Sequence, residues 1–390
     1  MPQIDRSFDV ETDLLVIGAG AAGMTAALVG ALEGLDVVLC EKSDMVGGTT
    51  ATSAGTVWIP GNQQGQLAGT PDTVEAARTY LAAMLGEHAK DERLDTFLKM
   101  GPIVLDYLEQ RTPVRFAAPP VHPDYKPLPG AAIGGRALGA IPFDGRELGD
   151  DFVRIRPPRR EFMVLGGMMV GKADIAPLLA PFRNWANFTH VAGLLARHAL
   201  DRVRYKRGTR LIMGNALVAR LFDGIRRAGV SLRFATGLRE ITCDGDAVVG
   251  AVLSSPRAEV TIRARKGVVL ATGGIGWSRE LRERLFPEAA QRFSLAPASN
   301  TGDGIWAAER VNAVIERDLD SPALWMPSSV MAQADGHLSV FPHIMLDRAK
   351  PGLLAVNKSG RRFVNEADSY HDFVEAMLRA NALAVPAFLI

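Results

Sequence analysis

The chain has 390 residues, of which 47% are hydrophobic and 22% are charged, so it can form one large or two medium domains with a sizeable core. Its 44 lysines and arginines balance 43 aspartates and glutamates, which argues against a nucleic-acid or anionic-membrane surface on charge grounds. The two cysteines, Cys40 and Cys243, have no CxxC or metal spacing. No apolar run approaches the roughly 18 residues of a membrane span, and residues 1–13 are polar. A soluble cytoplasmic protein with reduced cysteines is expected.

The first motif lies between two short apolar runs, Leu14–Ile17 and Val37–Leu39, which suit buried parallel strands. Between them stand Gly18-x-Gly20-x-x-Gly23, and the second run ends just before Glu41. The glycines permit a sharp turn and a close approach of the backbone to a pyrophosphate, and the following helix points its N–H groups at the phosphates. Glu41 lies 23 residues after Gly18, near the spacing of the acid that binds a ribose hydroxyl. The pattern therefore predicts a Rossmann-like dinucleotide site.

A second glycine-containing loop follows in residues 42–50, KSDMVGGTT, and a small-residue loop ends at Trp58-Ile59-Pro60. A polar surface loop is the alternative interpretation. The segment resembles the FAD signature of flavoproteins with two dinucleotide-binding domains, in the branch of the fumarate reductases and 3-oxosteroid dehydrogenases. That branch carries GGxT/S, then a small-residue loop and W-x-P. The resemblance implies FAD as the dinucleotide.

Apolar residues at near-helical spacing predict helix over roughly 73–108, including Val74, Ala77, Leu81, Met84 and Leu85. Residues 113–151 are rich in proline and glycine and predict a long functional loop. This loop resembles the DYxPxxPG…GR…PFDxRxLG stretch of the 3-oxosteroid 1-dehydrogenases, where the tyrosine is catalytic. Tyr125 matches that position. From the residues alone, Tyr125 would be a surface tyrosine.

Residues 172–229 predict helices with an arginine-rich face. The cluster of Arg202, Arg204, Lys206, Arg207 and Arg210 suits a phosphate or electron-carrier site, although a solvated helix face is the simpler interpretation. Short strands are predicted after residue 230, with a hairpin at Asp244-Gly245-Asp246.

Residues 267–274, GVVLATGG, predict another buried strand ending in a small-residue turn, and residues 300–305, NTGDGI, precede a helix. In the resembled family this strand returns to the first sheet, and both turns border FAD. The residues that the motif and the resemblance together assign to the cofactor are Gly18, Gly20, Ala21, Ala22, Gly23, Glu41, Lys42, Gly47, Gly48, Thr49, Thr50, Ser53, Ala54, Gly55, Ala271, Thr272, Gly273, Thr301, Gly302 and Asp303.

Residues 351–357, PGLLAVN, and 360–366, GRRFVNE, also resemble the family. Four residues after this glutamate the fumarate reductases carry a proton-donating arginine, whereas the 3-oxosteroid 1-dehydrogenases carry a tyrosine. Here the residue is Tyr370. Tyr370, Phe373, Val374 and Met377 also share one helix face, so packing is the alternative role. His122, His343 and His371 lack metal spacing, and no metal is expected.

The resemblance implies an α/β protein with a Rossmann-like FAD-binding domain in residues 1–328 and the start of an inserted α+β substrate domain in residues 329–390. It implies an FAD-dependent dehydrogenase that desaturates a 3-oxosteroid or similar cyclic ketone beside its carbonyl. By resemblance Tyr370 is the base and Tyr125 is its hydrogen-bond partner. A phenol with a pKa near 10 is a poor base at neutral pH unless its neighbours favour the anion. The alternatives are a flavin-dependent reductase or dehydrogenase of small di- or tricarboxylic acids, and a flavin-binding protein without turnover.

The chain contains only one GxGxxG, so no second site for NAD(P)H is expected, and electrons are expected to leave to a quinone or another acceptor. No histidine lies between Gly47 and Gly55, so non-covalent FAD is expected. Residues 384–390, AVPAFLI, end the chain inside an apolar run, and the resembled family continues beyond this point. We therefore expect a fragment with an incomplete substrate domain, weak FAD binding and little turnover.

Overall fold

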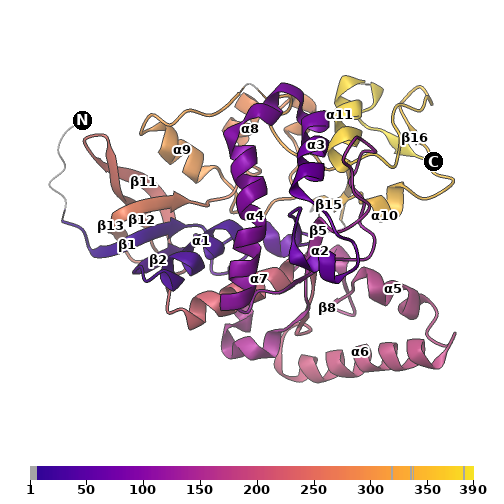
Figure 1. Ribbon diagram of the computed structural model, residues 1–390, viewed down its shortest axis with the longest axis horizontal. Helices are drawn as coiled ribbons and strands as arrows, with labels where there is room; N and C mark the ends of the chain where they lie inside the picture. Colours follow the sequence, from indigo (N-terminus) through magenta and orange to yellow (C-terminus); the bar gives the residue numbers. More distant parts are fainter. Residues whose placement is uncertain (1–6, 318, 334–335, 337, 381–382) are drawn as a thin grey trace. The chain divides into compact units, whose positions relative to one another are not determined.

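The computed structural model describes residues 7–317, 319–333, 336, 338–380 and 383–390 (Figure 1). Residues 1–6, the first part of the polar stretch 1–13, lie outside the described residues. The chain forms two compact units. The first unit comprises Met1–Asp124, Leu128–Gly273 and Asp303–Val311, and the second comprises Tyr125–Pro127, Gly274–Gly302 and Asn312–Ile390. The predicted domain boundary at residues 328 and 329 stays a prediction.

A six-stranded sheet in the order β10-β2-β1-β13-β12-β11 forms the centre of the first unit (Figure 1). Strands β10, β2, β1 and β13 are parallel, whereas β12 and β11 join them antiparallel. The predicted return of residues 267–270 to the first strand is confirmed, because Leu14–Ile17 pair with Gly267–Leu270. The predicted hairpin at residues 244–246 joins β11 to β12. The bounds are β1 Val10–Ile17, β2 Val37–Cys40, β10 Ser231–Arg233, β11 Gly237–Asp244, β12 Ala247–Ser254 and β13 Glu259–Leu270.

The last four residues of β1, Leu14–Ile17, are apolar because both faces of the sheet are covered there. Val16 packs in a cluster with residues of α1 (Ala21–Leu32) and α7 (Met213–Arg227). Leu15 and Ile17 point to the other face and pack with residues of β11, β12 and β13. All three side chains are at most 3% exposed. The alternation along one strand therefore fixes two cores, one on each side of the sheet.

The remaining elements of the first unit surround this sheet. The predicted helical region 73–108 forms α3, a short 3-10 helix and α4, but its buried residues include Ala77 and Tyr80, while Met84 and Leu85 are 38% and 39% exposed. The bounds are η1 Thr50–Thr52, β3 Thr56–Trp58, α2 Gln63–Leu67, α3 Val74–Leu85, η2 Gly86–Lys90, α4 Glu92–Arg111, β4 Phe116–Ala117, β5 Ala137–Ala140, β6 Phe143–Asp144, η3 Gly145–Arg154, η4 Arg160–Phe162, β7 Met163–Val164, β8 Met168–Met169, α5 Lys172–Leu179, α6 Trp185–Arg204, β9 Arg210–Leu211 and α9 Asp303–Glu309.

The basic cluster at residues 202–210 is only partly the solvated helix face that the sequence predicts. Helix α6 ends at Arg204, and Arg202 and Arg204 are exposed. Arg207 is buried over the ring of Phe152, at 4.6 Å from its centroid, and this burial lowers the pKa of Arg207 to about 10. Arg210 donates to Asp174 at 3.0 Å. These two arginines hold loops together instead of facing water.

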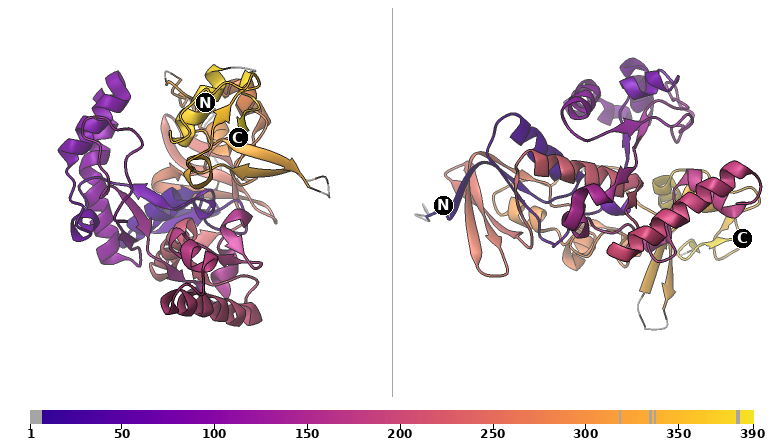
Figure 2. Two further views of the ribbon diagram at one scale, coloured as in Figure 1. Left: turned by 90° about the vertical axis from the view of Figure 1, so that its right-hand side faces the viewer. Right: turned by 90° about the horizontal axis from the view of Figure 1, so that it is seen from below.

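The second unit contains short helices, the pair β14 and β15, and the antiparallel pair β16 and β17, between which α11 lies in the sequence. Strands β14 and β15 pair antiparallel and form the hairpin seen in Figure 2. Helix α11 begins at Tyr370, and its capping residue Ser369 accepts a hydrogen bond from Asp372 N. No helix within the described part of the chain is long and apolar enough to cross a membrane. The bounds are α8 Arg279–Leu285, η5 Glu288–Ala290, β14 Ser328–Ala332, β15 Leu338–Pro342, α10 Met345–Arg348, β16 Ala355–Val356, α11 Tyr370–Arg379 and β17 Phe388–Leu389.

Candidate active site

The predicted glycine turn after β1 is tightly packed. Gly18 has φ +106°, and a Cβ there would lie 2.2 Å from the carbonyl oxygen of Ala271. A Cβ on Gly23 would lie 1.8 Å from the carbonyl oxygen of Gly18. Ala271 N donates to Ile17 O at 2.8 Å, so the turn after β13 lies directly beside the turn after β1. Only glycine fits at these two positions.

Gly20 differs from its two neighbours in the motif, because a Cβ there would meet no protein atom within 4 Å. It is the N-cap of α1 and, having no side chain, makes no side-chain cap hydrogen bond of its own. Ala21 N at the start of the helix donates to Thr50 Oγ1 at 3.3 Å. The open space beside Gly20 therefore lies at the positive end of the helix dipole, which fits a pyrophosphate.

Glu41 is held rigidly at the end of β2. It is 8% exposed, and its Oε2 accepts from Ala19 N at 2.8 Å. Its Oε1 accepts from the backbone N and the Oγ of Ser43, at 2.8 and 2.9 Å. Oε1 thus already accepts two hydrogen bonds, whereas Oε2 can accept one more. This arrangement fits one ribose hydroxyl, and it shows Ser43 as a supporting residue that the sequence motif does not mark.

The glycine-containing loop from Gly47 to Gly55 packs on the start of α7. Gly47 N donates to Ala19 O at 2.7 Å, and Gly214 N donates to Ser53 O at 3.2 Å. Asn215 Nδ2 donates to Ala51 O at 2.6 Å. Asn215 is fully buried, and its Oδ1 has no hydrogen-bond partner among the described residues. Sequence reasoning placed Gly214 and Asn215 on a helix but missed their contact with this loop, because no spacing rule links residues so far apart.

Further cofactor candidates of the first unit also meet in space. Asp303, the first residue of α9, forms an ion pair with Lys42 at 2.7 Å between Oδ2 and Nζ. Thr272 Oγ1 lies 2.1 Å from the Cβ that Gly304 lacks, so α9 begins against the turn after β13. Thr301 and Gly302 belong to the second unit, where Gly302 packs on Leu281. The first unit thus brings together the glycine turn, Glu41, the loop 47–55, Ala271–Gly273 and Asp303.

The two predicted catalytic tyrosines lie together in the second unit. The rings of Tyr125 and Tyr370 meet edge to face, with centroids 6.1 Å apart and planes at 69°. Lys126 Nζ and Asp372 Oδ1 form an ion pair at 3.0 Å beside them. Partial burial, the charge of Tyr370 and a hydrogen bond with it raise the pKa of Tyr125 to about 12. Tyr125 is therefore protonated at neutral pH and can donate a hydrogen bond to an ionised partner.

The segment that leads to Tyr125 is anchored by a buried ion triad in the first unit. Arg136 is 1% exposed and donates to both carboxylate oxygens of Asp72, at 2.8 and 2.9 Å. It also donates to Asp124 Oδ2 at 2.7 Å. Trp58 Nε1 donates to the other oxygen of Asp124 at 2.9 Å. Asp124, which directly precedes Tyr125 in the chain, is thus held by two side chains and also accepts from the backbone N of Ala132 at 2.9 Å.

Two histidines of the second unit have carboxylate neighbours. His343 lies between Ser329 Oγ, 2.5 Å from Nε2, and Asp347 Oδ2, 2.7 Å from Nδ1. His371 lies 4.0 Å from Glu375. Among the residues that the structure describes, no three His, Cys, Asp or Glu side chains gather so as to hold a metal ion.

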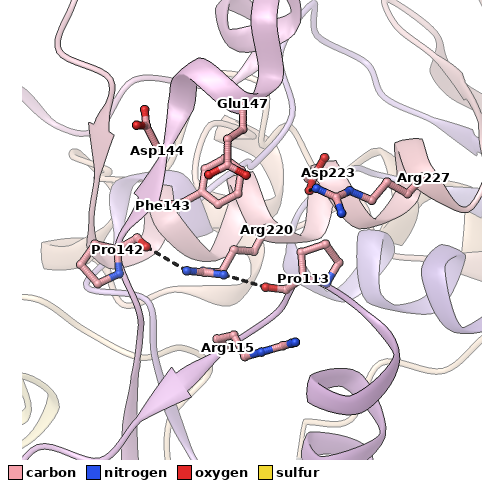
Figure 3. A pocket seen from close by; sticks show the side chains of 9 residues that line it. All are labelled: Pro113, Arg115, Pro142, Phe143, Asp144, Glu147, Arg220, Asp223 and Arg227. Carbon is pink, nitrogen blue, oxygen red and sulfur yellow. Dashed lines mark hydrogen bonds and ion pairs between the residues drawn. The ribbon is translucent and has the colours of Figure 1, made fainter.

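A separate pocket of about 220 Å³ lies in the first unit (Figure 3). Its central guanidinium, Arg220, donates to the backbone carbonyls of Pro113, Ile141 and Pro142 at 2.7 to 2.9 Å. Arg227 pairs with Asp223 at 2.7 Å. Arg220 therefore acts as a structural tie, and none of the predicted site residues lines this pocket. The lining residues are Pro113, Arg115, Pro142, Phe143, Asp144, Glu147, Arg220, Asp223 and Arg227.

Comparisons with known proteins find similarity over nearly the whole chain. Residues 13–385 match a family described as FAD binding domain. The 4-oxocyclohex-2-ene-1-carboxylate 5-dehydrogenase of Sinomonas cyclohexanicum is 36% identical over 382 residues, which cover 97% of this chain and 64% of that protein. The 3-oxosteroid 1-dehydrogenase of Mycobacterium tuberculosis is 36% identical over 373 residues, which cover 92% of this chain and 63% of that protein. The chain thus spans less than two thirds of the length of these relatives.

Solved structures share the fold of this chain over nearly its whole length. The 3-ketosteroid delta1-dehydrogenase of Sterolibacterium denitrificans, in complex with 1,4-androstadiene-3,17-dione, superposes with a TM-score of 0.86 at 31% identity. This match covers 97% of the present chain and 68% of that structure. A flavocytochrome c3 fumarate reductase shares the fold with a TM-score of 0.58 at 21% identity, over 96% of this chain and 51% of that one.

Proposed function

Because this chain belongs to the FAD-binding domain family, we propose that it serves in an FAD-dependent dehydrogenase that desaturates a 3-oxosteroid or a similar cyclic ketone beside its carbonyl. The observation that carries the proposal is the edge-to-face pair of Tyr125 and Tyr370. A phenol pair offers a base and a hydrogen-bond donor, which suits removal of an acidic proton beside a ketone. An enzyme for small dicarboxylic acids would need cationic groups that bind carboxylates.

Gly18, Gly20, Gly23 and Glu41 would hold the ADP half of FAD, and the loop 47–55 would hold its flavin half. Bound FAD supplies the acceptor for the hydride that leaves the substrate carbon. Tyr370, as its phenolate, takes the proton beside the carbonyl onto its oxygen and becomes a neutral phenol. Tyr125, which stays protonated, donates a hydrogen bond to that oxygen and keeps it oriented.

Three further features belong to the same proposal. FAD is bound without a covalent link, because the loop 47–55 carries no histidine. Electrons leave to a quinone or another acceptor, because the chain has no second GxGxxG for a nicotinamide nucleotide. The protein works in the cytoplasm on a hydrophobic ketone.

The test is a substrate screen with the full-length protein loaded with FAD and a dye as electron acceptor. The panel contains a 3-oxosteroid, 4-oxocyclohexanecarboxylate and, with reduced dye, fumarate. We expect dye reduction with a cyclic ketone and a product that has lost two hydrogens by mass spectrometry. Turnover of fumarate alone would refute the proposed substrate class, and no turnover of any panel member by flavin-loaded protein would refute the activity.

The roles of the tyrosines are tested by Tyr370→Phe and Tyr125→Phe. Loss of a general base lowers rates by roughly 10²–10⁴-fold, so Tyr370→Phe should fall in this range and Tyr125→Phe should fall less. Both variants should retain FAD absorbance. Tyr205→Phe is the matched control, because Tyr205 packs on Phe152 in the first unit, and its activity should be unchanged. Wild-type turnover by Tyr370→Phe would assign Tyr370 to packing in α11.

A further inference from the structure

Arg348, the last residue of α10, is a fully buried cation in the second unit. Its two terminal nitrogens donate to the backbone carbonyls of Glu366 and Asp368. Its Nε has no hydrogen-bond partner, and it forms no ion pair with a carboxylate, within the described part of the chain. A buried guanidinium without a counter-anion is costly, and burial lowers the pKa of Arg348 accordingly.

The faces of two aromatic rings border this guanidinium. The guanidinium carbon lies 5.3 Å from the ring centroid of Tyr370 and 5.1 Å from that of Phe373. The charges of Tyr370 and Tyr125 favour the protonated form of Arg348, and Arg348 in turn opposes the rise in the pKa of Tyr125. The two phenols are therefore electrostatically coupled to this cation. Tyr370 also stands in the first turn of α11, where the helix dipole favours negative charge.

We propose that Arg348 is a positioning residue that stabilises the phenolate of Tyr370 and so allows Tyr370 to act as the base. The inference deepens the proposed function and rests on it for the identity of the base. The phenolate is the counter-anion that the buried guanidinium otherwise lacks. The two backbone bonds of Arg348 also hold the segment 366–368 directly before α11.

The other charged groups around Tyr370 do not replace Arg348, because each has a partner of its own. Lys126, a further cation beside the tyrosines, is half-exposed and paired with Asp372. Each neighbouring acid also has a hydrogen-bond or ion-pair partner of its own. Asp347 keeps one oxygen without a hydrogen bond among the described residues, and its charge favours the protonated form of Arg348. The pairs are Lys126 with Asp372, Asp347 with His343, Glu366 with Arg362, Asp368 with Asn365, and His371 with Trp325 and Glu375.

The first test is the pH profile of turnover by the flavin-loaded full-length protein. An opposite charge at this range shifts an ionisation by about one to three pH units. Arg348→Met should therefore move the rising limb of the profile to higher pH by about one to three units and slow turnover at pH 7 about 10- to 1,000-fold. Arg348→Lys keeps the charge and should move the limb by less.

Arg362→Met is the matched control. Arg362 is 54% exposed and binds the side chain of Glu366 at 2.6 Å, so it supports the same segment from outside. A purely structural role for Arg348 predicts that both variants lose stability and leave the limb in place. A shift of the limb in Arg348→Met that is absent in Arg362→Met agrees with the proposal, and an equal limb position in all variants refutes it.

The second test does not depend on activity. The chain has five tyrosines, so fluorotyrosine labelling gives five ¹⁹F signals, and Tyr370→Phe identifies one of them. In the wild-type protein, the Tyr370 signal should reach its phenolate position at a lower pH than in Arg348→Met. If Arg348→Met does not fold, Arg348→Gln takes its place. A Tyr370 signal that titrates at the same pH with and without the arginine refutes the proposal.

The two tests separate the inference from the proposed function. A protein that desaturates no ketone but shows the early ¹⁹F titration retains the electrostatic role of Arg348 and loses the proposed activity. A protein that desaturates ketones but shows neither a pH shift nor an early titration retains the activity and loses the role of Arg348.

Discussion

Replacing Arg136 should cost far more stability than replacing an exposed arginine. Arg136→Met removes the cation that holds Asp72 and Asp124, whose side chains are 7% and 6% exposed. Both carboxylates would be left buried without their shared partner. Removing one member of a buried ion pair costs about 3–5 kcal/mol, because the remaining charge stays desolvated. The cost should stand at the upper end of this range, since Arg136 serves two acids.

The assay is urea unfolding followed by fluorescence and circular dichroism. Arg136 lies 5.7 Å from the ring of Trp58, so the fluorescence of this tryptophan should also change. The control is Arg279→Met in α8, because Arg279 and Glu283 form an exposed pair at 2.7 Å. A pair this exposed is screened by water and contributes little to stability. A decrease of less than about 1 kcal/mol in the free energy of unfolding of Arg136→Met would refute the reasoning, because the two acids would then not remain buried as unpaired charges.

Two further predictions concern the cofactor turn and acid stability. Gly20→Ala should fold with wild-type stability and bind FAD at least about tenfold more weakly, because its Cβ fills space beside the helix N-terminus. Gly18→Ala should instead destabilise the fold, because its Cβ meets Ala271 O at 2.2 Å. FAD titration and thermal unfolding separate the two effects, and equal FAD affinity for Gly20→Ala and wild type would contradict the assignment. Hydrogen bonds from Arg362 hold the pKa of Glu366 at about 2, below its ordinary 4.5, so the carboxylate stabilises the fold above about pH 4.5 and this stability is lost as the pH falls towards 2. Glu366→Gln should therefore differ most from wild type at neutral pH and converge with it in acid, and a difference that is constant with pH would contradict the prediction.

Local rules predicted the parts of the fold in which neighbours in sequence decide the structure. The apolar run at residues 14–17 is the second half of β1 and the run at 37–39 lies in β2, because full burial on both faces requires continuous apolar residues. The extension of β1 back to Val10 through the polar residues 11–13 was not predicted. The Asp-Gly turn at residues 244–246 formed the expected hairpin. The spacing of the glycines and strands indicated a dinucleotide site, and the family of the fold followed from the resemblance to known flavoproteins.

Features that depend on distant side chains escaped prediction. The pairing of Arg136 with Asp72 joins residues 64 positions apart, and the contact of Asn215 with the loop at Ala51 joins residues 164 positions apart. Neither follows a helical or strand period. The burial of Arg348 could not be predicted from the sequence for a different reason, because a single arginine in a short helix is normally exposed. Only the structure shows that it is buried among aromatic rings.

The pairing of β1 with β13 also has a consequence for synthesis of the protein. Val10 pairs with Ile262 and Ile17 with Leu270, so about 250 residues separate the partners. A ribosome adds roughly 5–20 residues per second, so β1 waits about 13–50 s for this neighbour. The glycine turn at Gly18 packs on Ala271 and cannot close earlier. The glycine turn that is expected to bind the nucleotide therefore forms late in translation. Until then only β2 and cellular chaperones can cover β1, whose second edge is unpaired.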